Sequence, residues 1–396
     1  MKIIIVPNEP NPNMTGRHYA VAKALAAAGH EVHELIWDLP QIMTKKQLVR
    51  HLFTSLRTGK YKYEDLTMHH IARLPLFWPY INGWLFKWQL RKLYRHTGAD
   101  IIFAESFTNE TSIPKELPYV YDLADDYAAP ADVYGRLFYK AMFKLLGVRS
   151  TMEKQCREAL AVTAVSSVLV NYAKSFNIHV IEVPNMLDVE NIELVKADKS
   201  TYPTNRYSLV YASMFGKWSR VTETMQTVIA LRNKFPNIEL TLAGGGPESA
   251  KIQQFIEDNN ASSYIHYLGY IKDRREWFGI MNRGAIGLNI SDKNKWRDAA
   301  NPIKVIEYCA LGKPVVSTNL DGVAALGFAN IMTFADNDSK EDGLYQALGR
   351  ALTKPERAYP DVSKNTLATY SRTKVIHDLV SVFVDAIKLG KEERPA

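Results

Sequence analysis

A repeated alternation of short apolar runs with segments of helical periodicity is the feature that most constrains the fold. It predicts α/β units and parallel sheets, here two doubly wound, Rossmann-like sheets in tandem. We expect helices at residues 17–28, 168–176, 222–234, 248–259, 275–281, 301–311 and 373–389. We expect strands at residues 3–6, 31–36, 99–104, 119–123, 160–166, 179–183, 207–212, 238–243, 265–268, 286–290 and 314–318.

A polar stretch at residues 188–205, without apolar periodicity, indicates a domain boundary. The length of 396 residues also fits two domains of roughly 100–200 residues each. We therefore expect a Rossmann-like N-terminal domain over 1–187, a Rossmann-like C-terminal domain over 188–372 and a C-terminal helix over 373–396 that packs back on the N-terminal domain. Doubly wound sheets bind ligands at the carboxyl ends of their strands, so two facing sheets would enclose a central cleft.

Charge is distributed unevenly along the chain. Residues 1–96 hold 14 Lys and Arg against 6 Asp and Glu, whereas the remainder holds 35 against 36. The basic N-terminal part favours an anionic partner there. Cys156 and Cys309 lack the spacing of a zinc site, and we expect them to be buried thiols. The sequence has neither a signal peptide nor a run of about 18 apolar residues, which predicts a cytoplasmic protein.

Two loops of the C-terminal half carry groups suited to an anion. Residues 212–217 follow an expected strand and contain Ser213, Gly216 and Lys217. Gly216 would let a ligand approach the backbone, and Lys217 supplies a cation, although a solvated surface lysine is the alternative. Residues 244–247, which include Gly245, form a glycine turn before a helix, where backbone N–H groups favour an anion. Tight packing would explain that turn equally simply. Its spacing is not that of a dinucleotide-binding motif.

Residues 301–316 form the most informative segment, NPIKVIEYCALGKPVV. Pro302 suits the start of a helix, and Lys304 lies in its first turn, where a cation opposes the helix dipole unless an anion binds there. Glu307 lies three residues further on, and therefore on the same face. Together a cation and a carboxylate could hold a phosphate and a sugar diol. An intrahelical Lys–Glu ion pair is the structural alternative.

This segment resembles the signature helix of retaining family 4 (group 1) glycosyltransferases, which have the GT-B fold. Further similar pieces follow in the family's order, and the resemblance is clearest over residues 119–330. The further similar pieces are Val165-Ser166, Val183-Pro184-Asn185 with Asp188, residues 242–247, residues 268–271 and residues 287–289.

The resemblance implies site residues and a mechanism. It places Glu307 on the ribose, Lys217 and Lys304 on the diphosphate, Tyr270 and Ile271 beside the base, and Gly16 near the donor phosphate or sugar. It also places Asp125 and Asp126 toward the transferred sugar or acceptor, although adjacent carboxylates could instead cap the next helix. The donor would be a UDP- or GDP-type sugar, without a metal. The leaving diphosphate would be stabilised electrostatically, and no protein nucleophile is expected.

Three departures from the family pattern bear on the site. Ala299 stands where the family has its first carboxylate, with Asp298 beside it. Ser213 stands near the place of an arginine that precedes the phosphate-binding lysine. The glycine pair of the first loop is reduced to Gly16, and the neighbouring Arg17 is our candidate for the missing cation.

Residues 74–96 mix aromatic with basic side chains. Trp78, Trp84 and Trp88 alternate with Lys87, Arg91, Lys92 and Arg95, and Ile81, Trp84, Leu85 and Trp88 share one helical face. An interfacial helix at the inner face of an anionic membrane is one interpretation. A helix whose aromatic residues pack into the core is the other. Nucleic acid is not expected.

These observations predict a hexosyltransferase of polysaccharide or glycolipid assembly, with a saccharide or lipid-linked acceptor. A non-hydrolysing sugar-nucleotide epimerase of the same fold is an alternative. A non-catalytic sugar-nucleotide-binding protein is the other, because of Ala299 and the missing arginine.

Overall fold

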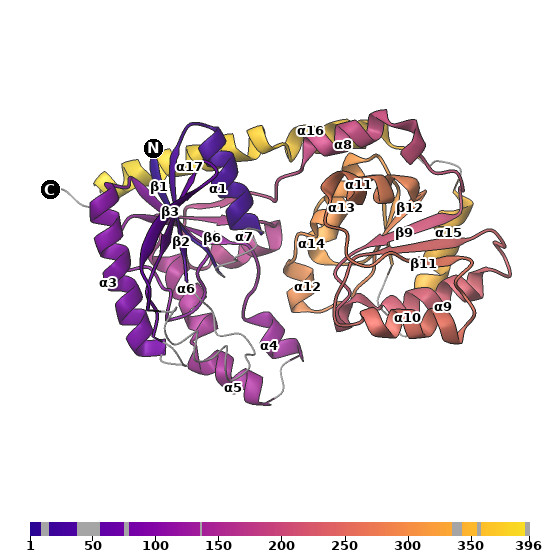
Figure 1. Cartoon of the computed structure of the whole chain (residues 1–396), viewed down its shortest axis with the longest axis horizontal. Helices are drawn as coiled ribbons and strands as arrows, with labels where there is room; N and C mark the ends of the chain where they lie inside the picture. Colours follow the sequence, from indigo (N-terminus) through magenta and orange to yellow (C-terminus); the bar gives the residue numbers. More distant parts are fainter. Residues whose placement is uncertain are drawn as a thin grey trace. The chain divides into compact units, whose positions relative to one another are not determined.

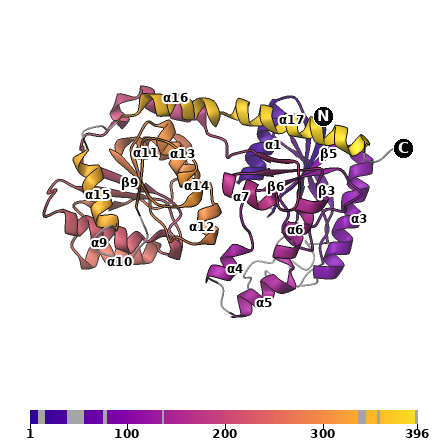
Figure 2. The same ribbon diagram turned by 180° about the vertical axis from the view of Figure 1, so that it is seen from behind.

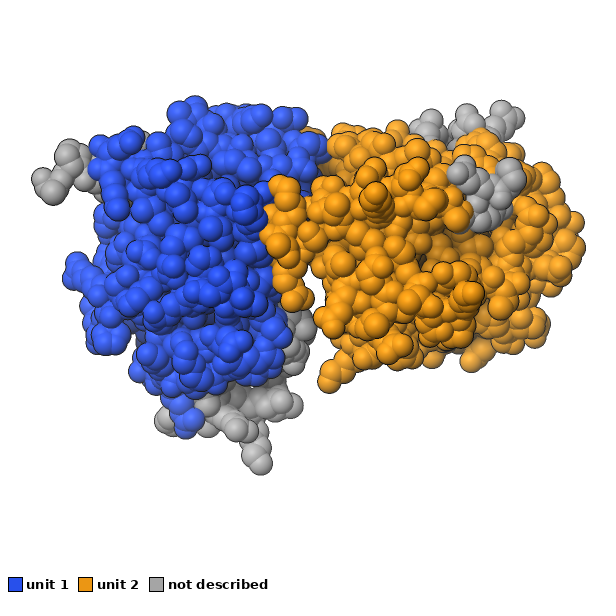
Figure 3. Space-filling model, turned by 90° about the horizontal axis from the view of Figure 1, so that it is seen from above, with its two compact units in different colours: residues 1–184, 375–396 blue, residues 185–374 orange. Residues whose placement is uncertain are grey.

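The structure, a computed structural model, divides into two compact units, coloured separately in Figure 3. It describes residues 1–8, 16–37, 56–74, 79–134, 137–334, 343–354 and 358–392. Unit 1 comprises Met1–Pro184 and Val375–Ala396, and unit 2 comprises Asn185–Lys374. The last helix therefore belongs to unit 1, and the boundary lies at Pro184, where the sequence analysis expected it after residue 187. The expected central cleft stays a prediction.

Unit 1 is built on an eight-stranded sheet of order β3-β4-β2-β1-β5-β6-β7-β8, with helices on both faces (Figures 1 and 2). Each pair of neighbours is parallel except β3 and β4. The strands are β1 (Lys2–Val6), β2 (Glu31–Ile36), β3 (Gly59–Tyr63), β4 (Leu66–His70), β5 (Ile101–Ala104), β6 (Tyr119–Leu123), β7 (Ala161–Ala164) and β8 (Val180–Glu182). The helices are α1 (Arg17–Ala27), α3 (Pro79–Thr97), α4 (Ala129–Tyr134), α5 (Leu137–Leu145), α6 (Val148–Glu158), α7 (Ser167–Ala173) and α17 (Arg372–Glu392).

Unit 2 has a six-stranded, fully parallel sheet of order β11-β10-β9-β12-β13-β14. Its strands are β9 (Ser208–Ala212), β10 (Glu239–Ala243), β11 (Ile265–Tyr267), β12 (Ile286–Asn289), β13 (Val315–Thr318) and β14 (Ile331–Phe334). Its α-helices are α8 (Val189–Ala197), α9 (Val221–Leu231), α10 (Ser249–Asp258), α11 (Arg274–Arg283), α12 (Lys295–Ala299), α13 (Ile303–Ala310), α14 (Asp321–Ala324), α15 (Leu344–Thr353) and α16 (Pro360–Thr369). Two short 3₁₀ turns, η1 (Lys199–Thr201) and η2 (Lys217–Ser219), complete the described elements.

Apolar residues fill both faces of the unit 2 sheet. One core cluster combines the strands with α9, α10 and α15, and the other combines them with α8, α11, α13 and α16. Strands such as β12 are buried along their whole length. This explains why they are continuous apolar runs in the sequence rather than alternating ones.

The stretch 188–205 was expected to mark the domain boundary, but it lies inside unit 2. It contains α8 and η1. Asp188 caps α8 by accepting a hydrogen bond from the Asn191 N–H (3.4 Å). Ile192 and Val195 are fully buried in unit 2. Val189 at the start of the helix packs against the same cluster, but these few apolar residues do not make a periodic pattern in the sequence.

Candidate functional site

The order of strands in unit 2 defines where a ligand would bind. From β9 the chain proceeds outward to β10 and β11, and from β12 outward to β13 and β14. The direction therefore reverses between β9 and β12. In open parallel sheets, ligands bind at such a switch point, outside the carboxyl ends of the strands. The segments that leave these two strands there begin at Ser213 and at Ile290.

Lys304 lies at this edge, in the first turn of α13. Pro302 is the N-cap of the helix, and the Lys304 Nζ donates to the Ser213 hydroxyl (2.6 Å). Burial lowers the pKa of Lys304 to about 7, and the positive charge of Arg297 acts in the same direction. The predicted partners Ser213 and Lys304 are thus brought together from positions 91 residues apart.

Glu307 is 2% exposed and lies one turn further along α13. Its two carboxylate oxygens accept hydrogen bonds from the Arg274 guanidinium (2.6 Å) and from the Trp277 indole N–H (3.3 Å). The sequence analysis left open an intrahelical pair between Lys304 and Glu307. That alternative is wrong, because each side chain bonds to a group outside α13.

The glycine turn after β10 packs tightly against the loop after β9. A Cβ on Gly244 would lie 1.8 Å from the Ser213 carbonyl oxygen, and one on Gly246 would lie 2.4 Å from the Phe215 carbonyl oxygen. Both glycines also have positive φ, 127° and 147°. A Cβ on Gly245 would meet only Tyr270, at an ordinary 3.5 Å. Packing therefore explains two of the three glycines, and Gly245 is the one that a binding role could still explain.

Gly216 and Lys217 sit at the start of η2. A Cβ on Gly216 would clash with the ring of Trp218, at 2.4 Å, so this glycine makes room for a tryptophan. Trp218 contacts Trp296 of α12 edge-on, with ring centroids 5.3 Å apart. Lys217 is exposed. The predicted diphosphate ligand Lys217 thus begins a turn that packs against α12.

The remaining candidate site residues of unit 2 are Tyr270, Ile271 and Asp298. Tyr270, after β11, is 75% exposed, whereas Ile271 packs against the unit 2 core. The Asp298 carboxylate accepts hydrogen bonds from Lys293 Nζ (2.9 Å) and from the Asp321 N–H (3.2 Å). Asp298 thus fixes α12 against α14, which is a structural use of the carboxylate.

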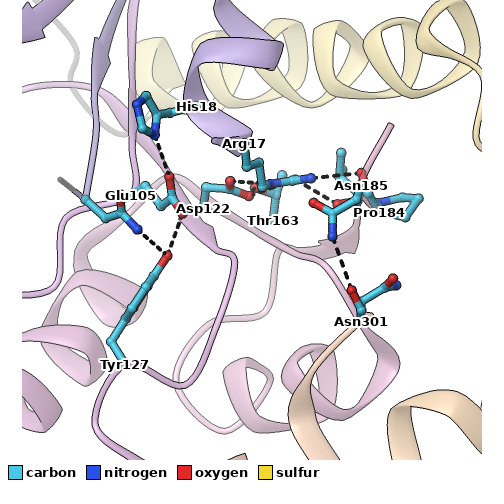
Figure 4. A network of polar contacts seen from close by, with 11 residues as sticks. Arg17, His18, Glu105, Asp122, Tyr127, Thr163, Pro184, Asn185 and Asn301 are labelled. Atoms are coloured by element: carbon cyan, nitrogen blue, oxygen red, sulfur yellow. Dashed lines mark hydrogen bonds and ion pairs between the residues drawn. The ribbon is translucent and has the colours of Figure 1, made fainter. Parts of the chain in front are cut away.

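Gly16 and Arg17 begin α1 in unit 1, and Figure 4 shows Arg17 among its partners. Gly16 has φ 108°, a conformation that favours glycine. The Arg17 guanidinium donates to both Asp122 carboxylate oxygens (2.7 and 3.2 Å) and to the carbonyls of Val183 and Pro184 (2.8 and 2.9 Å). This pairing inside unit 1 satisfies the arginine. The candidate role of Arg17 as the missing cation of the family stays a prediction.

Asp125 and Asp126 follow β6 directly. The Asp126 carboxylate accepts hydrogen bonds from the N–H groups of Ala128 and Ala129, both at 3.1 Å, at the start of α4. Asp125 accepts from the Asp126 N–H (2.8 Å). The helix-capping alternative is therefore realised for Asp126.

Sequence reasoning missed a buried polar cluster in unit 1, of which Figure 4 shows His18, Glu105 and Tyr127. His18 lies 3.6 Å from carboxylate oxygens of both Glu34 and Glu105, and the Tyr127 hydroxyl donates to Glu105 (2.5 Å). Burial raises the pKa of Glu34 to about 7. A signal was present for Glu105, because it directly follows an apolar strand, the position where parallel sheets place functional groups.

Helix α3 contains the aromatic segment, apart from Trp78, which lies outside the described residues. The exposed residues of this helix include Tyr80, Ile81, Trp84, Trp88, Lys92 and Arg95. Trp84 is 67% exposed and Trp88 is 50% exposed, whereas Phe86 and Leu90 are buried. The two tryptophans therefore point away from the core. None of the helices in the described part of the chain has the length and apolarity needed to cross a bilayer.

A comparison with protein families finds a match within unit 2. Residues 206–354 match the family model for glycosyl transferases group 1. The matched range contains Ser213, Lys217, Lys304 and Glu307. No curated protein sequence matches the chain.

Solved structures share the architecture of the whole chain. HepE from Anabaena, in complex with UDP, superposes with a TM-score of 0.65 at 12% identity, over 97% of this chain and 100% of that one. A glycosyltransferase from Rickettsia africae gives 0.63 at 14% identity, over 98% of both chains. WaaG, a glycosyltransferase involved in lipopolysaccharide biosynthesis, gives 0.61 at 14% identity, over all of both chains. The predicted GT-B fold is confirmed. With the family match, it supports a glycosyltransferase as the class of enzyme.

Proposed function

We propose that the protein transfers a hexose, with retention, from a UDP- or GDP-type sugar to a saccharide or lipid-linked acceptor. The reaction would serve polysaccharide or glycolipid assembly. The observation that carries this proposal is the pairing of Lys304 with Ser213 at the β9/β12 switch point, with Glu307 one turn away. Similarity to a structure that holds UDP supports the donor class. Similarity to WaaG, a glycosyltransferase involved in lipopolysaccharide biosynthesis, supports a role in polysaccharide or glycolipid assembly.

The roles follow from charge and position. Lys304 and Lys217 would stabilise the diphosphate as negative charge develops on it during departure. Glu307 would accept hydrogen bonds from the ribose hydroxyls, and Arg274 and Trp277 already orient its carboxylate. Cationic side chains can stabilise the departing diphosphate without a metal. We place Asp125 toward the transferred sugar or acceptor.

Thermal unfolding with UDP, GDP, ADP and NAD tests the donor site. At about 100 times the dissociation constant, a ligand adds about 2.7 kcal/mol to the stability of the native state, which is a rise of a few degrees in Tm. We expect one nucleoside diphosphate to stabilise the protein. Glu307→Gln should weaken its binding about 10- to 100-fold, because a hydrogen bond to a charged group is lost. Glu276→Gln, an exposed carboxylate of the neighbouring helix α11, is the matched control.

Stabilisation by NAD alone, or by none of the four ligands, would contradict the proposal. Where a diphosphate binds, incubation with the corresponding nucleotide hexose and acceptor saccharides identifies the reaction. A changed sugar in the recovered nucleotide would mean an epimerase, and an unchanged donor with every acceptor would mean a binding protein.

We also propose that the exposed face of α3 contacts an anionic membrane. Tryptophan with lysine and arginine on one helix face is typical of interfacial helices. Lys92 lies over the Trp88 ring, 5.5 Å from its centroid. Sedimentation with phosphatidylcholine vesicles, with and without phosphatidylglycerol, measures this contact. We expect binding only with the anionic lipid, lost in the double variant Trp84→Ser/Trp88→Ser and kept in Tyr345→Ser. Equal sedimentation of the three proteins would contradict it.

A further inference from the structure

Arg297 lies in the short helix α12, between β12 and α13, and the sequence analysis gave it no role. The position of α12 is well determined by its neighbours. The Asn294 side chain caps it by accepting from the Arg297 N–H (3.1 Å), and Lys293 bridges Asp298 and Asp321 (2.9 and 3.0 Å). These contacts fix the backbone from which the Arg297 side chain extends.

The charge of Arg297 is not balanced by the protein around it. It forms no ion pair with any residue in the described ranges, and its Nε is buried without a hydrogen bond to any of them. The guanidinium carbon lies 5.3 Å from the centroid of the Trp296 ring. Arginine at a partly buried position ordinarily has a carboxylate or carbonyl partner, as Arg17 does in unit 1.

A second cation lies close to the first. The positive charge of Arg297 lowers the pKa of Lys304, adding to the larger effect of burial. Burial raises the pKa of Tyr211, and Arg297 opposes that rise. The Lys304 Nζ lies 5.4 Å from the centroid of the same tyrosine ring. Lys304 thus lies over the Tyr211 ring of β9, and the positive charge of Arg297 acts on both groups.

Two partly desolvated like charges repel each other, and an anion placed between them removes that cost. Trp296, next to Arg297, packs against Trp218, next to Lys217, so a third cation belongs to an element in contact with α12. A diphosphate carries several negative charges on two adjacent phosphoryl groups and can therefore contact more than one cation. A guanidinium binds phosphate oxygens in a bidentate manner.

We propose that Arg297 binds the diphosphate of the nucleotide donor and shares it with Lys304. This inference rests on the proposed function, because it takes the donor to be a nucleoside diphosphate sugar. It assigns to α12 the arginine that the family pattern lacks at Ser213. Arg297 would then be a specificity determinant for the phosphate groups and not for the base.

Isothermal titration separates phosphate recognition from base recognition. The wild type is titrated with UDP, GDP and ADP, and then with the nucleoside that corresponds to the tightest of the three. For Arg297→Gln we expect diphosphate binding about 10- to 100-fold weaker, with nucleoside binding changed less than about twofold. Arg297→Lys should retain part of the affinity. Lys295→Gln removes an exposed cation from the same helix and should leave binding unchanged within about twofold.

The failures of the two proposals are distinguishable. If the wild type binds none of the three diphosphates, the proposed function fails, and this inference with it. If the wild type binds one and Arg297→Gln binds it as tightly as Lys295→Gln does, Arg297 is no phosphate ligand. Equal losses for the diphosphate and the nucleoside would also overturn the inference. Thermal unfolding without ligand shows whether each variant folds, and Arg297→Lys serves if Arg297→Gln does not.

Discussion

The switch points of the two sheets differ in how their charges are balanced. In unit 1, at the start of α1, the polar groups have partners inside the unit: Arg17 is paired with Asp122, and the His18 ring lies between Glu34 and Glu105. In unit 2, between β9 and β12, neither the exposed Lys217 nor the buried Lys304 forms an ion pair with a carboxylate among the described residues, and the ion pair of Glu307 is with Arg274.

This difference separates two uses of buried charge. Where each charged side chain is paired with another inside the protein, the pairs stabilise one arrangement of the chain. Where positive side chains lack such pairs, an anionic ligand can supply the opposite charge. We therefore interpret the Arg17–Asp122 pair as part of the framework of unit 1, and the cations around Ser213 as part of a binding site. Substitutions in the Arg17–Asp122 pair should lower stability without changing binding, and substitutions of the cations around Ser213 should lower binding.

The largest expected effect is on the framework. Asp122→Asn leaves the Arg17 guanidinium buried without its counter-charge, which should cost about 3–5 kcal/mol of unfolding free energy in urea. Diphosphate affinity at a temperature where the variant is folded should not change. Glu64→Gln, which breaks the half-exposed pair with Lys23, is the control and should cost less than about 1 kcal/mol. A loss of diphosphate affinity at unchanged stability would reverse our assignment.

The glycine turn offers a paired test within unit 2. Gly244→Ala forces a Cβ against the Ser213 carbonyl oxygen and should cost about 1–3 kcal/mol of stability. Gly245→Ala meets only ordinary contact and should change stability by less than about 0.5 kcal/mol. Thermal unfolding of both variants measures the difference. Equal destabilisation would mean that the turn is not held against the β9 loop as described.

The smallest expected effect is a pH dependence of binding. The pKa of Lys304 is lowered to about 7, so the free protein loses this positive charge as pH rises through that value. An anion binds the protonated form better, and its affinity should therefore fall with rising pH, by at most about tenfold per pH unit. Titration above pH 7, where the terminal phosphate is already largely dianionic, isolates the lysine. Lys304→Met should abolish the slope. A wild-type affinity independent of pH would contradict the role of Lys304.

Much of the fold could be predicted because buried parallel strands are apolar along their whole length. Residues 286–290, for example, were expected as a strand, and β12 spans Ile286–Asn289. Strand β3 was missed because all five of its residues are exposed, so no apolar pattern marks it.

The site was predictable only where a local pattern existed. Pro302, Lys304 and Glu307 share one short segment with a recognisable spacing. Arg297 has no such signal, because its meaning depends on its lying near Lys304 and Tyr211 in the folded unit. The pairing of Glu307 with Arg274 likewise joins residues from two helices, α11 and α13, and no spacing in the sequence encodes it.

The chain passes from unit 1 to unit 2 at Pro184 and returns at Val375, which makes unit 2 an insertion within unit 1. During synthesis, at about 5–20 residues per second, α17 emerges roughly 10–40 s after the rest of unit 1. Unit 2 is continuous and can fold in that interval. Unit 1 meanwhile lacks the helix whose Phe383 packs on Phe103 of β5. Unit 2, where we propose the donor site, is therefore complete first, and unit 1, which is synthesised first, is completed last.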